Sequence, residues 1–164
     1  MTVAFFSGKG RRIGVALGAV SAGLLVLSAC DKPTPLATVT VGDDSVSAEA
    51  ACYNDGKGLK NSEAEKCLNK KAEKTIEVST TDTVHFGVDP EIADNGWTLF
   101  VEGQRGEPEP SKKTYRSFPG AAFFSSQSSQ TGEAAAPKNT QISIVETKGA
   151  KVIGIWHFKL EKTD

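Results

Sequence analysis

The fold is decided by one stretch of the sequence, residues 142–160, which reads ISIVETKGAKVIGIWHFKL. Polar and apolar side chains alternate from Ile142 and Ile144 onward, a pattern typical of a β-strand. The segment 147–150 contains a glycine and joins this strand to a last strand over 151–160. The stretch therefore predicts two consecutive strands.

The last of these strands is apolar on both faces. One face carries Val152, Trp156, Phe158 and Leu160, and the other carries Ile153, Ile155 and His157. A strand that is covered on both sides of its sheet has this pattern. We therefore interpret His157 as a partly buried, hydrogen-bonded histidine of a central strand.

Similar alternation continues toward the N-terminus. It is carried by Val39 and Val41, by Val46 to Cys52, by Ile76 and Val78, by Val84 to Val88, and by Trp97 to Val101. Seven or so short strands in about 130 residues favour a mainly β fold, an antiparallel β-sandwich that is immunoglobulin-like in broad architecture. The Ig fold itself is not established, because Trp97 follows both Cys52 and Cys67 instead of lying between them.

One short helix is predicted after Ser62, because Ser62 and Glu65 have the spacing of a capping box. Ala64, Cys67, Leu68 and Ala72 would share its buried face, and Lys66, Lys70 and Lys74 would share another. We interpret these lysines as a solvated face, with a small basic patch facing anionic lipid or cell-wall phosphate as the alternative.

The first 29 residues have the features of a cleaved export signal. They contain no Asp or Glu, they carry Lys9, Arg11 and Arg12, and residues 13–27 are uncharged. A helix of that uncharged length spans roughly 22 Å, short of the roughly 30 Å hydrocarbon core of a bilayer. A signal peptide over 1–29 is therefore favoured over a permanent transmembrane anchor, and Sec export over a twin-arginine route.

The sequence LSAC at residues 27–30 resembles the bacterial lipobox. In that family the cysteine sulfur receives a diacylglyceryl group, and cleavage makes the cysteine the new N-terminus. The resemblance implies lipidation of Cys30 with acyl chains such as palmitate. Two acyl chains anchor a protein stably, so the expected location is the outer face of the cell membrane, with the protein tethered by lipid.

The predicted organisation is a signal peptide (1–29), a lipidated tether (30–37) and a β-sandwich domain (38–164). The full chain has 19 basic and 20 acidic residues and a net charge of −1. Removal of the three basic leader residues leaves a net charge of −4, which argues against nucleic acid as a partner.

Cys52 and Cys67 remain in a compartment where disulfides persist, and we expect them to pair. A redox pair or a metal site is less favoured, because both usually need closer cysteines.

A long loop is predicted over residues 125–140, which contain no Val, Ile, Leu or aromatic residue. It follows Phe118, Phe123 and Phe124. We interpret these phenylalanines as residues of an edge strand that cap the core. The functional alternative is an apolar binding site with the loop as its lid.

No catalytic, cofactor or metal motif is found. The chain has two histidines, and its single methionine is Met1, so a copper site of the cupredoxin type is not supported. A Ser–His–Asp triad at His157 stays open, because its partners need not be near in sequence. A Gly-x-Ser-x-Gly or Ser-x-x-Lys motif is absent from the sequence.

The segments VDPEIA (88–93), Trp97 and GIWHF (154–158), together with the lipobox, resemble small actinobacterial lipoproteins that carry a domain of unknown function. The resemblance implies a location and a small β domain, and it supplies no catalytic residues. We therefore expect a membrane-anchored binding module of the cell envelope, with an envelope protein or a small ligand as partner. The alternative is a small extracytoplasmic hydrolase or ligand-carrier that uses a pocket near His157 and the 118–140 loop.

Overall fold

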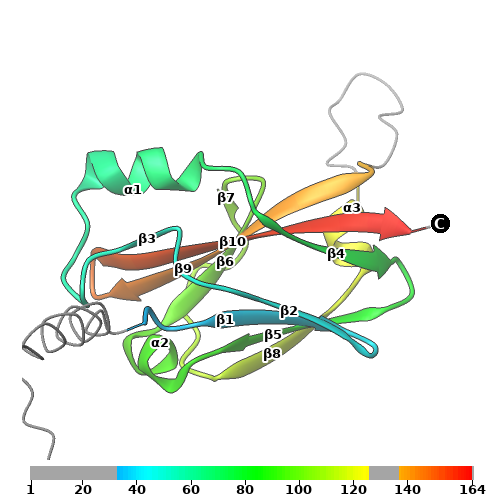
Figure 1. The fold of residues 1–164 in the computed structure, drawn as a ribbon, viewed down its shortest axis with the longest axis horizontal. Helices are drawn as coiled ribbons and strands as arrows, with labels where there is room; N and C mark the ends of the chain where they lie inside the picture. Colours follow the sequence, from blue (N-terminus) through cyan, green and yellow to red (C-terminus); the bar gives the residue numbers. More distant parts are fainter. Residues whose placement is uncertain (1–32, 126–136, 164) are drawn as a thin grey trace, which may run out of the picture. The chain divides into compact units, whose positions relative to one another are not determined.

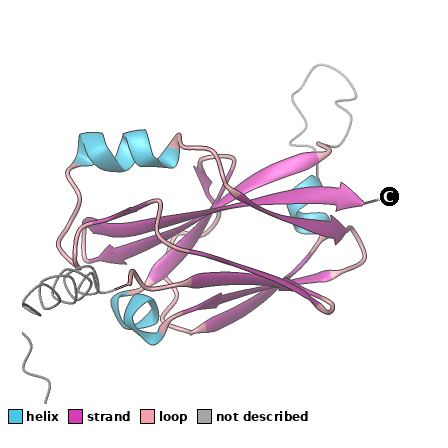
Figure 2. Cartoon of the chain, in the orientation of Figure 1, coloured by secondary structure: helices cyan, strands magenta, loops and turns pink. Residues whose placement is uncertain are grey.

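The structure is a computed structural model that describes residues 33–125 and 137–163 (Figure 1). The predicted signal peptide, Cys30 and residues 126–136 of the predicted loop lie outside the described residues. Within these ranges the chain forms two β-sheets that pack face to face, with helices at their edges and on one outer face (Figure 2). The predicted mainly β sandwich is thus confirmed.

The first sheet has four antiparallel strands in the order β2–β1–β5–β8. Their bounds are Ala37–Val41 for β1, Asp44–Ala48 for β2, Thr83–Val88 for β5 and Tyr115–Pro119 for β8. Alternate side chains of β1 and β5 point to the other sheet, and Val39, Val84 and Phe86 are fully buried there.

The second sheet is built around β10 (Lys151–Thr163). One edge of β10 pairs with β9 (Asn139–Lys148), which continues to β6 (Trp97–Val101) and β7 (Gln104–Arg105). The other edge pairs first with β3 (Cys52–Tyr53) and then with β4 (Lys74–Ser79). The β4 pairing is parallel, which is a local exception to the predicted antiparallel arrangement.

The prediction of one strand from Val46 to Cys52 is wrong. The structure breaks this segment after Ala48, and the chain crosses from β2 in the first sheet to β3 in the second. The crossing is held by the amide of Ala51, which donates to the carbonyl of Ile155 at 2.8 Å. Alternation alone does not reveal such a change of sheet, because it continues through the crossing.

The predicted helix is α1 (Asn61–Leu68), which lies over the outer face of the second sheet (Figure 1). Its apolar side consists of Ala64 and Cys67, which pack against Val145 and Ile155. Two shorter helices are α2 (Pro90–Asn95) and α3 (Ala121–Phe124). Asp94 and Asn95 form the end of α2, and Gly96 is its C-cap.

The predicted capping box at Ser62 and Glu65 is wrong. The N-cap is Lys60, two residues before Ser62, and the carboxylate of Glu63 at N3 accepts a hydrogen bond from the Lys60 amide at 3.2 Å. The helix ends at Leu68, where the Asn69 side chain donates to the carbonyl of Glu65 at 2.9 Å.

This early end separates the three lysines that the sequence placed on one helix face. Lys66 belongs to α1, whereas Lys70 lies in the following link and Lys74 begins β4. Ala72 likewise lies beyond the helix.

The two faces of β10 differ from the sequence prediction at one point. The register with β9 shifts between Val152 and Gly154, and Val152 packs with Ile155 on the helix side instead of with Trp156 in the main core. A side chain at Gly154 would bring its Cβ to 2.5 Å from the Trp156 ring. Residue 154 must therefore be glycine, because the Trp156 ring occupies the space that a side chain would need beside the bulge.

Candidate ligand-binding cleft

A cleft of about 600 Å³ opens where the first sheet, the crossing after β2 and the link after α1 meet. We call it the N-terminal cleft. It is lined by Leu36, by the segment 47–51, by Lys70, Lys71, Glu73 and Lys74, and by His157 of β10.

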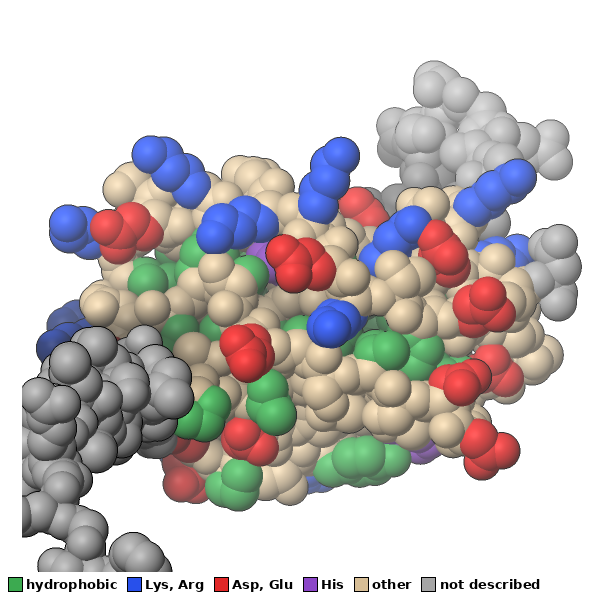
Figure 3. Space-filling view, viewed as in Figure 1, with side chains coloured by type: hydrophobic (Ala, Val, Ile, Leu, Met, Phe, Trp, Pro, Cys, Tyr) green, Lys and Arg blue, Asp and Glu red, His purple; other side chains and the backbone are tan. Residues whose placement is uncertain are grey.

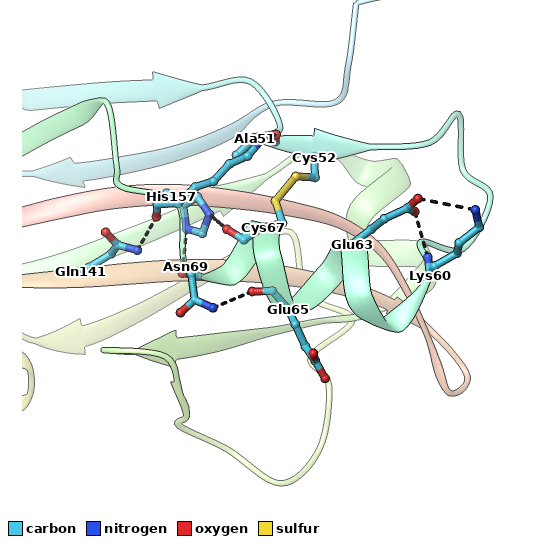
Figure 4. The surroundings of a disulfide bond; sticks show 11 residues. Ala51, Cys52, Lys60, Glu63, Glu65, Cys67, Asn69, Gln141 and His157 are labelled. Atoms are coloured by element: carbon cyan, nitrogen blue, oxygen red, sulfur yellow. Dashed lines mark hydrogen bonds and ion pairs between the residues drawn. A yellow bond between two sulfur atoms is a disulfide. The ribbon is translucent and has the colours of Figure 1, made fainter.

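Backbone hydrogen bonds and one amide side chain hold the walls of the N-terminal cleft. Gln141 of β9 donates from Nε2 to the carbonyl of Lys70 at 2.9 Å, and its Oε1 accepts from the amide of Ala72 at 3.2 Å. Lys70 in turn donates from Nζ to the carbonyl of Ala51 at 3.0 Å. Gln141 and His157 lie near the end of α1 in Figure 4. The link after the helix is thus fixed to both the sheet and the crossing.

His157 is 4% exposed and has a partner at each ring nitrogen. Its Nε2 lies 2.9 Å from the carbonyl oxygen of Cys67 (Figure 4). Its Nδ1 lies 2.8 Å from the Ser143 hydroxyl. A carbonyl oxygen only accepts, so Nε2 carries the hydrogen and Nδ1 accepts from Ser143. Burial lowers the pKa of His157, which keeps the ring neutral at pH 7.

The buried, hydrogen-bonded histidine expected from the sequence is confirmed, although His157 also reaches the cleft wall. Its partners are a hydroxyl and a carbonyl, and neither is the carboxylate that a Ser–His–Asp triad requires. Ser143 is 1% exposed, which removes its hydroxyl from the reach of a substrate. The pair orients the ring and joins β9, β10 and α1.

The disulfide predicted between Cys52 and Cys67 is present, with a Cα–Cα distance of 6.2 Å. It joins β3 to α1, and Cys67 is fully buried (Figure 4). Because the carbonyl of the same Cys67 accepts from His157, the disulfide and the histidine fix one point of the helix from two sides.

The charges around the N-terminal cleft are mixed, with an excess of one positive charge. Lys70, Lys71 and Lys74 face Glu49 and Glu73 along its lining, and Leu36 beside them is 40% exposed. Figure 3 shows basic side chains interspersed with acidic ones on the face that it views. This lining contrasts with the net acidic charge expected for the mature chain.

The three phenylalanines proposed as a binding site contribute to the core. Phe123 and Phe124 are buried, and Phe118 packs edge-on against Phe86 and Phe123 with ring centroids 5.9 and 6.1 Å apart. Phe123 also lines a second cleft of about 460 Å³, together with Ser125, Pro137 and Thr140. Thr140 belongs to β9, which begins at Asn139, so the predicted extent of the loop to residue 140 is wrong. A role of these residues in binding stays a prediction.

The sequence reasoning missed one residue, Glu146 of β9. It is fully buried, its Oε1 accepts from the Asn95 amide at 2.6 Å, and its Oε2 has no hydrogen-bond partner among the described residues. Burial raises its pKa, and the nearby charge of Glu91 acts in the same direction. A usable signal was present, because Glu146 follows Ile142 and Ile144 at strand spacing and so must point inward.

The segments that carry the family resemblance have structural roles in the fold. Asp89 accepts from the Leu36 amide at 2.7 Å, Asn95 binds Glu146, and the Trp97 indole donates to the carbonyl of Lys113 at 2.7 Å. These bonds attach the N-terminal segment to the start of α2, α2 to β9, and β6 to the segment before β8.

Searches of known protein families, of characterised proteins and of solved structures find no match to this chain. Residues 33–125 and 137–163 bring together no group of three or more His, Cys, Asp or Glu side chains suited to a metal ion. The same residues include no helix with the length and apolar character needed to cross a membrane.

Proposed function

We propose that the protein is an extracytoplasmic lipoprotein, anchored by lipid on Cys30, whose domain serves as a binding module of the cell envelope. It would belong with the small actinobacterial lipoproteins that its sequence resembles. The observation that supports binding is the N-terminal cleft, because Leu36, which with Thr34 and Pro35 belongs to the predicted tether, is part of its lining.

The domain holds these three residues in place. The Thr34 hydroxyl accepts from the Ala50 amide at 3.3 Å, and the carbonyl of Pro35 accepts from the Trp156 indole at 2.8 Å. The folded part therefore begins before residue 38, the predicted domain boundary. A tether this short favours a partner that itself lies in or at the membrane.

The anchor is tested by Cys30→Ser in the full chain, followed by metabolic labelling with an alkyne fatty acid and membrane fractionation. We expect the natural protein to incorporate label and sediment with membranes. The variant should lose the label and either stay uncleaved or leave the membrane. A processed, unlabelled variant that stays with the membrane would contradict the proposal.

Binding at the cleft is tested in the same cells with a photo-crosslinking amino acid at Lys71, and at Lys112 as the matched control. Both lysines are exposed, and Lys112 lies outside the cleft lining. A binding module should give a discrete adduct at position 71 and none at position 112. Identical adducts at both positions would argue against a specific site.

A small ligand-carrier is the second candidate, favoured by the cleft at Phe123 and Thr140 beside the predicted loop. Native mass spectrometry of protein purified from membranes tests it. A carrier should keep a bound small molecule that is lost in denaturing spectra, whereas identical masses in both spectra would count against it. The hydrolase form is not favoured, because the ring of His157 bonds a backbone carbonyl and the hydroxyl of the buried Ser143, and neither partner is a carboxylate.

A further inference from the structure

We propose that the N-terminal cleft binds the headgroups of anionic phospholipids in the membrane that holds the anchor. This inference rests on the proposed lipidation of Cys30 and adds the identity of the partner. It follows from the reach of the tether, the position of the cleft and the charges of its lining.

The tether leaves the domain little distance from the bilayer. Thr34 is fixed to Ala50, so only four residue steps separate the anchored Cys30 from a held position. Each step spans at most about 3.6 Å, so the Cα atoms of Cys30 and Thr34 are within about 14 Å of each other. The bilayer surface therefore lies next to whichever part of the domain surrounds Thr34.

That part is the N-terminal cleft. Leu36 forms one wall, and Ala50, the hydrogen-bond partner of Thr34, belongs to another. The amide of Leu36 is also held, by the carboxylate of Asp89 at 2.7 Å. Thr34 and Leu36 are thus both held at the cleft, and the cleft cannot move far from the membrane while the anchor is inserted.

The lining suits an anionic headgroup. Lys71 and Lys74 are exposed, and Lys70 is oriented by its bond to the carbonyl of Ala51. Lysine side chains act on anionic lipid only within about a Debye length, about 8 Å at physiological salt, and the short tether provides that proximity. The half-exposed Leu36 adds an apolar contact of the kind found at the membrane interface.

The acidic residues Glu49 and Glu73 in the same lining limit the attraction. They reduce the net charge of the lining to one positive charge, so the attraction of the three lysines depends on a high density of anionic lipid beside the cleft. We therefore expect a dependence on lipid charge and on salt.

The test uses the lipidated protein purified from membranes and placed in vesicles of phosphatidylcholine, with or without phosphatidylglycerol. A water-soluble acylating reagent reports the reactivity of each lysine by peptide mass spectrometry. We expect Lys71 and Lys74 to react several-fold more slowly in the anionic vesicles, and high salt to remove the difference. Lys112 and Lys113, which are exposed and outside the cleft lining, should react equally in both.

Equal reactivity of Lys71 and Lys74 in the two vesicle types would overturn the inference. Protection by inorganic phosphate in neutral detergent, to the extent given by anionic vesicles, would also overturn it, since the site would then take a free anion. The mass of the N-terminal peptide distinguishes a failure of the proposed lipid anchor from a failure of the headgroup site alone. An unmodified Cys30 refutes the anchor, whereas a lipidated Cys30 with unprotected lysines refutes only the headgroup site.

Discussion

Glu146 is the residue whose environment departs most from that of an ordinary surface carboxyl group. Its side chain stands in the main core beside Ile144, and a single amide hydrogen bond from Asn95 satisfies one of its oxygens. An ionised carboxylate in such a place is costly, so the protonated form is favoured. A carboxyl group that stays protonated contributes stability below the ordinary pKa of 4.5 and loses it as the pH rises through the higher folded value.

We therefore expect Glu146→Gln to increase the free energy of unfolding at pH 8 by on the order of 1 kcal/mol relative to the natural chain, because an amide cannot ionise. At pH 4 the two proteins should be nearly equal. Urea denaturation at both pH values measures the difference. Glu77→Gln, at an exposed position of β4, is the matched control and should leave the profile unchanged. A parallel shift of Glu146→Gln at both pH values would refute the assignment.

At the scale of secondary-structure elements, the disulfide is the covalent attachment of α1, beside its packing and the hydrogen bond from His157. α1 contributes Ala64 and Cys67 to a small apolar cluster on the outer face of the second sheet. A helix of eight residues is marginal by itself in water, so its position depends on the cross-link and on this packing.

Replacement of both cysteines by alanine should lower the free energy of unfolding by about 3 kcal/mol, as expected for a closed loop of 15 residues. Thermal and urea unfolding, with and without reductant, measure the loss. Reductant should reproduce the effect in the natural domain and change nothing in the double variant. Equal stability of the oxidised and reduced natural protein would contradict this role.

Much of the secondary structure was predictable, because the alternation of polar and apolar residues along a strand depends only on neighbouring positions in the sequence. Trp97 and Leu99, or Val84 and Phe86, share a buried face as their spacing predicts. The capping of α1 was misplaced by two residues, because Ser62 is a favoured N-cap residue type, whereas the actual N-cap is Lys60. The pairing of Cys52 with Cys67 was accessible from the chain entropy of the loop and the expected compartment.

The remaining features depend on contacts between distant residues. The parallel pairing of β4 with β10 and the break after Ala48 are set by which edge of β10 is vacant. The bulge at Gly154 depends on the Trp156 ring and on Tyr53 of another strand. The N-terminal cleft likewise combines segments more than 100 positions apart, so its lining has no sequence motif.

At the scale of the whole molecule, we expect low pH to reduce the stability of the fold through two residues, His157 and Glu107. The pKa of His157 is lowered by burial, so its contribution to stability is present above its ordinary pKa of 6.5 and is lost as the pH falls through the lower folded value. Glu107 acts in the same direction. Its hydrogen bond to Arg116 lowers its pKa, and its contribution is lost below the ordinary value of 4.5.

We expect the natural domain to lose stability as the pH falls below 6.5, because the unfolded chain then binds a proton at His157 that the buried ring does not. His157→Gln should be less stable at pH 7 by about 1–3 kcal/mol, since buried partners lose a hydrogen bond, and it should show a flatter profile over this range. Urea midpoints across the range measure both effects. His85→Gln, which changes the other histidine, should keep the natural slope. An unchanged slope in His157→Gln would refute the prediction.

The position of β10 has a consequence for how the protein is made. β10 pairs with β3, β4 and β9, and it is the last described strand in chain order. A chain that crosses a membrane from its N-terminus would expose β3, α1 and β4 to the oxidising side before their shared partner arrives. The disulfide can close at that stage, since both cysteines precede β10 by more than 80 positions. Export and anchoring would thus precede completion of the second sheet, and the membrane surface would be the place where the domain finishes folding.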